Sequence, residues 1–208
     1  MAQHGPEPGT ILNESGVPTE PRQAATVIVV RGGADRLEIL MAQRTPKARF
    51  MGGAWVFPGG AVDAHEGTGD ASHRAAAVRE VEEEVGITLP DPAALVPFAR
   101  WITPPEVSIR FDTYFFIAVA PADAEIKVDG QEIVDARWFE PSRALEGAEA
   151  GELLMVFPTI KNLERIARFK SADELVQWAS THEVRPVQPR VEGHGETARI
   201  VLDDEDLP

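Results

Sequence analysis

The sequence contains no cysteine, and its 208 residues include a single tyrosine. The absence of cysteine excludes disulfide bridges, thiolate nucleophiles and zinc sites with cysteine ligands. Basic residues are also scarce, because 20 Lys and Arg stand against 34 Asp and Glu and leave a formal net charge of -14. Surfaces that bind nucleic acid need clustered Lys and Arg, so we expect no nucleic-acid partner. An acidic protein can still bind phosphate groups through a cation.

Long apolar runs are missing as well. No stretch approaches the roughly 18 apolar residues that span a bilayer, and residues 1–22 hold three Gly and four Pro without the apolar segment of a secretory signal. We therefore expect a cytoplasmic protein with no membrane partner. Residues 1–22 are expected to form a flexible arm, and residues 23–208 a single domain.

Periodicity predicts a mixed α/β chain. The β-branched run at residues 25–30 and the run at 37–41 flank Gly32 and Gly33, which predicts a hairpin. A short strand at 55–57 ends at Pro58, a helix begins near Pro141, and later strands are expected at 96–101, 113–119, 136–139 and 197–202. Apolar stripes at 159–169 and 172–178 predict two C-terminal helices. These helices complete the core, cap a substrate cleft or form a homodimer.

Residues 72–85 predict a further helix of unusual composition. Apolar residues recur along it at three- and four-residue spacing, and Gly86 is the expected C-terminal stop. The predicted buried stripe is Ala75, Val78 and Val81, with Ala71 and Val85 in phase. The acidic residues occupy another face.

Four glutamates in five positions make this helix informative. Glu80, Glu83 and Glu84 share one face, whereas Glu82 points elsewhere. Like charges at this spacing cost roughly a few tenths of a kcal/mol on a solvated helix, and much more in a cleft, unless a cation neutralises them. The run is therefore either a solvated acidic face or a site for a hard cation such as Mg²⁺ or Mn²⁺.

The neighbouring residues favour the cation site. Gly60, Glu66 and residues 79–87 (REVEEEVGI) resemble the Nudix box, GX5EX7REUXEEXGU with U aliphatic, except that twelve residues instead of seven separate the glutamate from the arginine. The resemblance implies the Nudix fold, an α/β/α sandwich with a mixed β-sheet and a core at about 23–145, to which the C-terminal helices at about 159–180 are added.

The resemblance also implies roles for individual residues. Mg²⁺ or Mn²⁺ would be bound by Glu80, Glu83, Glu84 and the carbonyl of Gly60, while Glu66, Arg79, Gly59 and Gly86 would support the box. Arg79 is expected to pair with Glu66, with Asp70 in the insertion as the rival partner. The reaction would be attack of water on a diphosphate, with Glu80, Glu83 or Glu132 as the catalytic base.

The segment before the box suggests the substrate. Leu40, Arg44, Arg49, Gly53 and the FPGG sequence at 57–60 resemble the additional motif of coenzyme A diphosphatases, with Met41, Ala42 and Thr45 departing from it. Arg44 and Arg49 would then bind substrate phosphates. The segments at 100–105 and 110–116 look like the acyl-CoA diphosphatase branch, which implies coenzyme A or acyl-CoA as substrate and 3′,5′-ADP and (acyl-)4′-phosphopantetheine as products.

Other interpretations stay open at this point. Pro104 and Pro105 keep an ADP-ribose or nucleotide-sugar diphosphatase as the chief alternative, and a Nudix-fold regulator that binds a nucleotide without hydrolysing it is a second. Arg44 and Arg49 could be structural. Trp101 and Phe111 could stack on an adenine, although large aromatic residues beside strands are more often part of the core.

Overall fold

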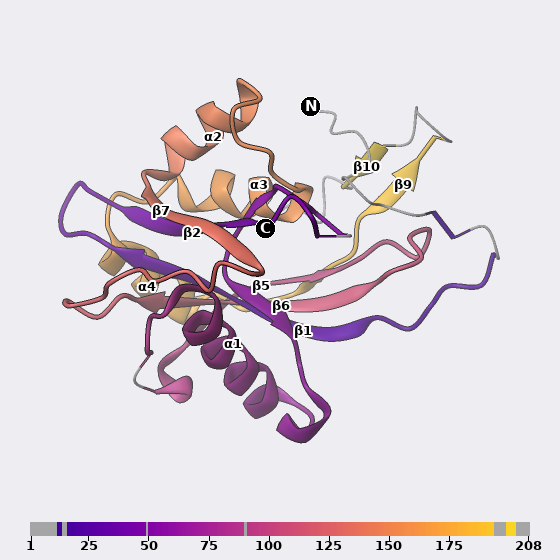
Figure 1. Ribbon diagram of the computed structural model, residues 1–208, viewed down its shortest axis with the longest axis horizontal. Helices are drawn as coiled ribbons and strands as arrows, with labels where there is room; N and C mark the ends of the chain where they lie inside the picture. Colours follow the sequence, from indigo (N-terminus) through magenta and orange to yellow (C-terminus); the bar gives the residue numbers. More distant parts are fainter. Residues whose placement is uncertain (1–11, 14–15, 49, 90, 194–198, 203–208) are drawn as a thin grey trace.

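The protein is described by a computed structural model, which covers residues 12–13, 16–48, 50–89, 91–193 and 199–202. A mixed sheet lies between helices on both of its faces (Figure 1). The strands are β1 (Arg22–Arg31), β2 (Glu38–Arg44), β3 (Trp55–Val56), β4 (Gly59–Ala61), β5 (Val96–Ile102), β6 (Phe111–Val119), β7 (Ile133–Phe139), β8 (Pro186–Val187), β9 (Arg190–Glu192) and β10 (Arg199–Val201). The helices are η1 (Ala64–Glu66), α1 (Asp70–Val85), η2 (Pro92–Ala94), α2 (Pro141–Glu149), α3 (Phe157–Ile166) and α4 (Ala172–Thr181).

The order of the main sheet is β3-β2-β1-β6-β5-β8, with β4 on β1 and β7 on β2. β1 and β6 run parallel over nine residue pairs, and β5 pairs in parallel with β8, while the other pairings are antiparallel. β9 and β10 form a separate two-stranded sheet. The predicted mixed sheet is therefore confirmed.

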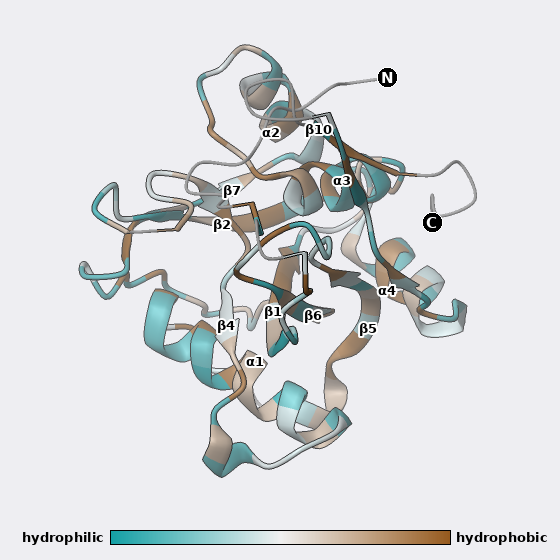
Figure 2. Cartoon of the chain, turned by 90° about the vertical axis from the view of Figure 1, so that its right-hand side faces the viewer, coloured by the Kyte–Doolittle hydropathy of each residue, from teal (hydrophilic) through white to brown (hydrophobic). Residues whose placement is uncertain are grey.

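Alternation along β1 separates two cores. Its residues Ala25, Val27 and Val29 pack on the face that α1 covers, through the helix residues Ala76, Ala77, Val81 and Val85. Ile28 and Val30 point to the opposite face and join Leu163 and Ile166 of α3 and Leu175 of α4. Successive strand residues point to opposite faces, so one strand supports both helical layers. Figure 2 shows hydrophilic residues (teal) on turns of α1 that face away from the strands.

β1 and β2 diverge, and the turn at residues 57–60, where the predicted box begins, lies between them. β2 pairs with β1 only at Glu38 and Ile39. Farther along, β2 pairs with β3 while β1 pairs with β4, and the amide of Val27 donates to the carbonyl of Pro58 between them. The turn at residues 57–60 is thus held by hydrogen bonds from two diverging strands, which fixes its backbone beside α1.

Most predicted elements are present, with differences in their bounds. α1 begins at Asp70, two residues before the predicted start, and ends at Val85; the next residue, Gly86, has a left-handed φ of 69°. The predicted buried stripe is partly wrong: Val81 and Val85 are buried, but Ala75 and Val78 are only partly buried and Ala71 is exposed. Ala76 and Ala77 are buried in their place. Consecutive alanines are all small and apolar, so they do not reveal which of them faces the sheet.

The C-terminal helices contribute to the core, since Leu163, Ile166 and Leu175 are fully buried there. This packing supports the first of the three roles considered for them, and a homodimer stays a prediction. Within the described residues, no helix is both long and apolar enough to cross a membrane.

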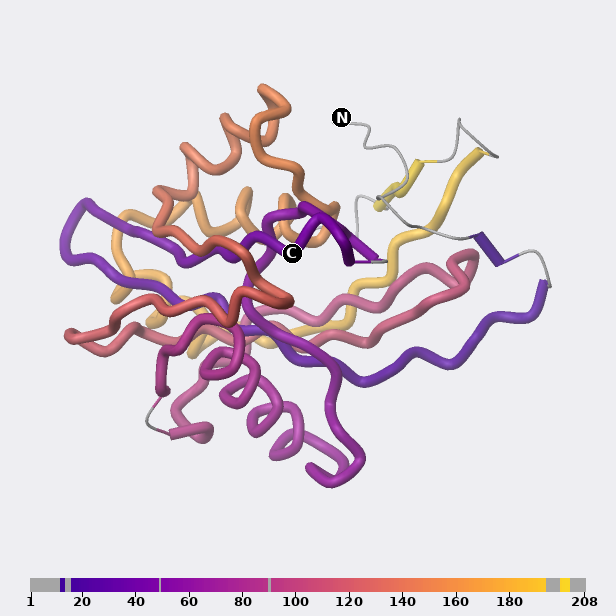
Figure 3. Tube along the Cα trace, in the orientation of Figure 1, coloured from indigo at the N-terminus to yellow at the C-terminus, as the bar shows by residue number. Residues whose placement is uncertain are grey.

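The described part of the expected N-terminal arm is attached to the β5–β6 connection. The amide of Asn13 donates to the carbonyl of Glu106, and the hydroxyl of Thr19 donates to the carbonyl of Ser108. The buried Arg110 side chain in turn donates to the carbonyl of Thr19 at 2.7 Å. Figure 3 shows this indigo segment following the β5–β6 turn. Residues 1–11 and 14–15 of the expected arm lie outside the described part of the chain.

Candidate active site

Glu84 is a buried carboxylate on the inner side of α1. It is 4% exposed, and its Oε2 accepts a hydrogen bond of 2.9 Å from the backbone N–H of Gly59. Burial raises the pKa of Glu84 to about 8, the charges of Glu80 and Glu132 act in the same direction, and the Gly59 hydrogen bond opposes them. A carboxylate held in this environment favours either a proton or a cation as its partner.

Glu80 lies one helical turn before Glu84, with 15% of its side chain exposed. Its carboxylate sits so close to Gly60 that a Cβ at that position would collide with it. A side chain at position 60 would therefore require the Glu80 carboxylate to move. Burial raises the pKa of Glu80, with Arg79 opposing the shift and Glu83 and Glu132 adding to it.

Arg79 is hydrogen-bonded to three of the box glutamates. Its Nε donates to Glu66 at 3.0 Å, and its Nη1 donates to Glu80 at 2.8 Å and to Glu83 at 3.0 Å. The Glu66 hydrogen bond is the largest cause of the raised pKa of Arg79. Burial raises the pKa of Glu66, but its hydrogen bonds with Arg79 and with the N–H of Asp63 outweigh burial and lower the pKa overall.

The structure pairs Arg79 with Glu66 despite the insertion in the box. The rival, Asp70, is bonded to Arg74 instead. After η1 the chain passes through Gly67, with a φ of 85°, and Gly69, with a φ of 90°, and then enters α1. The additional residues are accommodated in this glycine-rich turn and in the first turn of the helix, so Glu66 still reaches the arginine.

Glu132 lies on the loop before β7 and forms an ion pair with Arg44 at the end of β2. Arg44 Nη2 and Glu132 Oε1 are 2.8 Å apart, and 53% of the Glu132 side chain is exposed. The Nε of Arg44 is buried without a partner. Two residues that the sequence assigns to separate tasks, phosphate binding and proton transfer, thus contact each other. Arg49 lies outside the described residues.

The remaining box glutamates are more exposed. Glu83 has 60% of its side chain exposed and faces Arg79, and Glu82 is exposed and accepts a hydrogen bond from the Thr88 hydroxyl. Glu82 thus points away from the cluster, as the helix periodicity predicts.

Among the residues that the structure describes, no three Asp, Glu or His side chains converge as a ready-made metal site. The donor set nevertheless fits a hard cation, because Glu84 is buried, Glu80 is partly buried, and the charge of Glu80 disfavours the charged form of Glu84. Arg79 partly balances Glu80 and Glu83, whereas the hydrogen bond that Glu84 accepts comes from the neutral backbone N–H of Gly59. A divalent cation would supply the missing positive charge.

The segments around Arg100 and Phe111 are explained by packing. Arg100 donates to both carboxylate oxygens of Asp112, at 2.8 and 2.7 Å, across β5 and β6. Trp101 is buried, and its Nε1 donates to Asn162 at 3.2 Å, so it belongs to the core and not to a ligand platform. Phe111 is partly buried, with its ring centroid 6.2 Å from that of Phe50.

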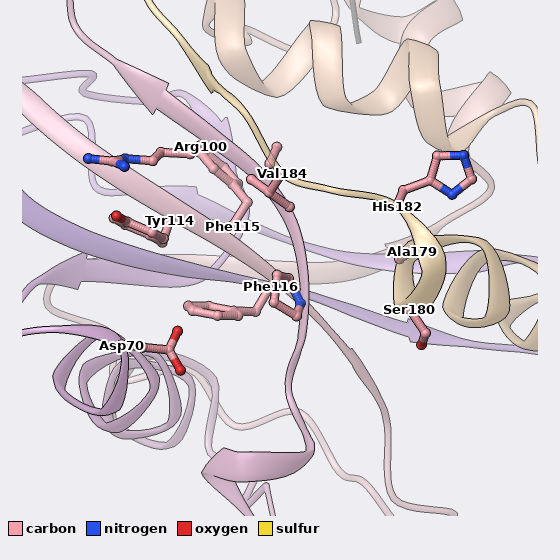
Figure 4. A pocket seen from close by; sticks show the side chains of 11 residues that line it. Asp70, Arg100, Tyr114, Phe115, Phe116, Ala179, Ser180, His182 and Val184 are labelled. Carbon is pink, nitrogen blue, oxygen red and sulfur yellow. The ribbon is translucent and has the colours of Figure 1, made fainter.

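A separate cavity of about 370 Å³ opens beside Arg100 (Figure 4). It is lined by the start of α1, by β5 and β6 and by the end of α4, including Asp70, Arg100, Tyr114, Ala179, His182 and Val184. Asp70 precedes Glu80 by ten residues, which is about 15 Å along a helix. This cavity is therefore distinct from the acidic cluster.

Comparison with protein families assigns this region to a known domain. The model of the NUDIX domain matches residues 21–159, which include every element that carries the acidic cluster. The chain belongs to the Nudix family. Nudix hydrolases generally act with a divalent metal, in agreement with the donor set described above. The predicted Nudix fold and hydrolase class are therefore confirmed.

Individual Nudix relatives extend this result. A Caenorhabditis elegans protein that carries the name nudix hydrolase 7 is 26% identical over 203 residues, covering 81% of this chain and 68% of the relative. The acyl-coenzyme A diphosphatase NUDT19 of Xenopus laevis is 31% identical over 91 residues, which are 42% of this chain and 24% of the relative. The crystal structure of a NUDIX hydrolase from Alicyclobacillus acidocaldarius superposes with a TM-score of 0.70 at 27% identity, covering 81% of this chain and 99% of that one.

Proposed function

We propose that the protein is a Mg²⁺- or Mn²⁺-dependent diphosphatase that hydrolyses coenzyme A or acyl-CoA. The observation that carries the hydrolytic part is the pair formed by the buried Glu84 and the partly buried Glu80 against the Gly59–Gly60 backbone. The identity of the substrate is supported by the coenzyme A motif that ends at this backbone and by the similarity to an acyl-CoA diphosphatase.

In this proposal Glu80, Glu83, Glu84 and the Gly60 carbonyl hold the cation. A divalent cation held by these residues would supply positive charge for the non-bridging oxygens of the diphosphate. Binding requires Glu83 to turn from Arg79, which its 60% exposed side chain permits. Arg79 keeps its hydrogen bonds to the 6% exposed Glu66 and therefore continues to hold η1 against α1 as a structural support.

Arg44 and Glu132 divide the remaining work. Arg44 binds a phosphate oxygen through its guanidinium, whose Nη2 is paired with Glu132 in the structure. Glu132 accepts a proton from the attacking water. The water oxygen forms a new bond to one phosphorus, the phosphoanhydride P–O bond breaks, and the bridging oxygen leaves on the other phosphate. Exchange of the Arg44–Glu132 ion pair for an Arg44–phosphate contact releases Glu132 for this step.

The substrate is tested with coenzyme A, ADP-ribose, NADH and nucleoside triphosphates, each incubated with the protein and Mg²⁺ or Mn²⁺, with products identified by mass. We expect 3′,5′-ADP and 4′-phosphopantetheine from coenzyme A. Rapid cleavage of ADP-ribose with coenzyme A intact would overturn the substrate proposal and favour the ADP-ribose alternative.

The phosphate contact is tested by Arg44→Ala, which should raise KM for coenzyme A at least tenfold. Arg143→Ala is a suitable control, because Arg143 pairs with Glu146 at 2.6 Å on the exposed surface of α2. An unchanged KM in Arg44→Ala would assign Arg44 a structural role. Arg49 remains a predicted phosphate ligand by resemblance alone and is tested in the same way.

A further inference from the structure

Asp129 organises the loop that carries Glu132. Its Oδ2 accepts hydrogen bonds from the backbone N–H groups of Gln131 (3.2 Å) and Glu132 (2.9 Å), and its Oδ1 accepts one from Ile133 (2.8 Å). One carboxylate thus binds three consecutive amides. Such side-chain contacts stabilise a turn in place of regular backbone pairing.

The turn is attached on both sides to the candidate active site. The backbone N–H of Asp129 donates to the carbonyl of Glu84 at 3.2 Å, at the end of α1. The carbonyl of Glu132 accepts a hydrogen bond of 2.7 Å from the N–H of Thr45, next to Arg44. The loop therefore spans from the helix that carries the glutamates to the strand that carries the arginine.

The Glu132 side chain has little else to fix its position. It is about half exposed, and within the described part of the chain its side chain is held by the ion pair with Arg44. In the proposed reaction that ion pair is exchanged when a phosphate binds Arg44. The direction of the Glu132 side chain then depends on the backbone from which it projects, and this backbone is held by Asp129.

We propose that Asp129 is a positioning residue, which holds the backbone of Glu132 so that its carboxylate faces the attacking water. This inference rests on the proposed function, in which Glu132 is the base. A displacement of the order of 1 Å at a catalytic group can lower a rate by about 10²-fold. Three hydrogen bonds to the backbone at and beside Glu132 are placed to prevent such a displacement.

The experiment compares kcat and KM for the diphosphate that the wild type hydrolyses in the panel above. Asp129→Ala should lower kcat by roughly tenfold or more and leave KM within twofold. Asp129→Asn, which keeps one carbonyl acceptor, should recover part of the loss. Asp91→Ala is the matched control, because Asp91 also accepts a backbone N–H bond, from Ala93 at 2.8 Å, in an exposed turn remote from Glu132.

Glu132→Gln and the double variant Asp129→Ala/Glu132→Gln complete the cycle. If Asp129 acts through Glu132, the Asp129 substitution lowers kcat in the wild-type background and has little further effect once Glu132 is replaced. Equal losses in both backgrounds, or a loss matched by Asp91→Ala, would overturn the inference. A slow Glu132→Gln beside a fully active Asp129→Ala overturns the positioning role alone. Full activity in Glu132→Gln removes the base assignment and the inference together.

Discussion

Two clusters of carboxylates and arginines in this protein differ in how their charges balance. Between β5 and β6, one arginine meets one carboxylate: Arg100 binds both oxygens of Asp112. Burial raises the pKa of Asp112, but the Arg100 contact outweighs it and the pKa lies below its ordinary value. This cluster is neutral and self-sufficient.

The box cluster is not balanced. One arginine, Arg79, is hydrogen-bonded to Glu66, Glu80 and Glu83, while the buried Glu84 has a pKa raised to about 8. Fold stability alone does not explain why Glu84 is buried without a hydrogen bond from any cationic side chain in the described part of the chain, because an apolar or neutral residue at this position would have a smaller desolvation penalty. The contrast separates a structural ion pair from the cluster that, in the proposed function, binds a divalent cation.

The largest expected effect comes from Glu84→Gln. Loss of roughly 4 kcal/mol of metal-based charge stabilisation in the transition state corresponds to about a 10³-fold lower kcat/KM. The fold should survive, because the substitution removes a carboxylate whose charged form is disfavoured by burial. Steady-state kinetics and circular dichroism measure the two effects. Glu82→Gln, on the exposed side of the same helix, should change neither; wild-type turnover by Glu84→Gln would contradict the metal assignment.

Arg100→Ala, in the balanced cluster, should lower stability and leave catalysis intact, the opposite of Glu84→Gln. It leaves Asp112, with 7% of its side chain exposed, without its cation, which should lower the free energy of unfolding by about 3 kcal/mol. Urea denaturation measures the loss, and kcat of the folded fraction should stay near that of the wild type. Arg143→Ala, which breaks an exposed pair, should cost no more than about 0.5 kcal/mol. A stable Arg100→Ala with impaired catalysis would reverse the roles of the two clusters.

Metal addition should distinguish the clusters in the unmodified protein. At a concentration about 100 times Kd, Mg²⁺ or Mn²⁺ should stabilise the fold by about 2.7 kcal/mol. A thermal melt with and without EDTA should therefore show a Tm shift of roughly 5–10 °C. Glu84→Gln should lose most of this shift, while Arg100→Ala, although less stable, should keep it. An equal shift in Glu84→Gln would place the cation elsewhere.

The smallest effect is the pH dependence of the balanced cluster. Because the pKa of Asp112 is lower in the folded state than its ordinary value of 3.8, the ion pair contributes stability at neutral pH. That contribution is lost as pH falls below about 3.8 and through the folded-state pKa. Urea midpoints of the wild type and Asp112→Asn should therefore differ at pH 6 and approach each other near pH 3. A constant difference would show that Asp112 contributes by hydrogen-bond geometry and not by charge.

The helical glutamates could be predicted from the sequence because their geometry is local. Spacing along one helix places Glu80 and Glu84 on a shared face and turns Glu82 away, and the structure has this arrangement. The αL stop at Gly86 is equally local. Most predicted strands are present for the same reason, since runs of β-branched residues favour the extended conformation locally.

Contacts between segments that are distant in the sequence could not be predicted. The pairing of Arg100 with Asp112 depends on the register of β5 against β6, and the contact of Arg44 with Glu132 joins segments 88 residues apart. The short strands β4, β8 and β9 were not predicted either, although β3 and β10, which are equally short, were. Asp129 was missed although Asp129-Gly130 is a common turn signal, because its effect is on the following three amides.

The turn between η1 and α1 also matters for how such chains are detected and modified. A Cβ at Gly67 or Gly69 would meet no other atom within 4 Å, so this turn projects into open space while its two ends stay joined through Glu66 and Arg79. The contact between Glu66 and Arg79 therefore does not depend on a fixed number of residues between them. A search profile for related genomes should permit a gap of variable size here, and Thr68 is a suitable point for grafting an epitope or a fluorescent label.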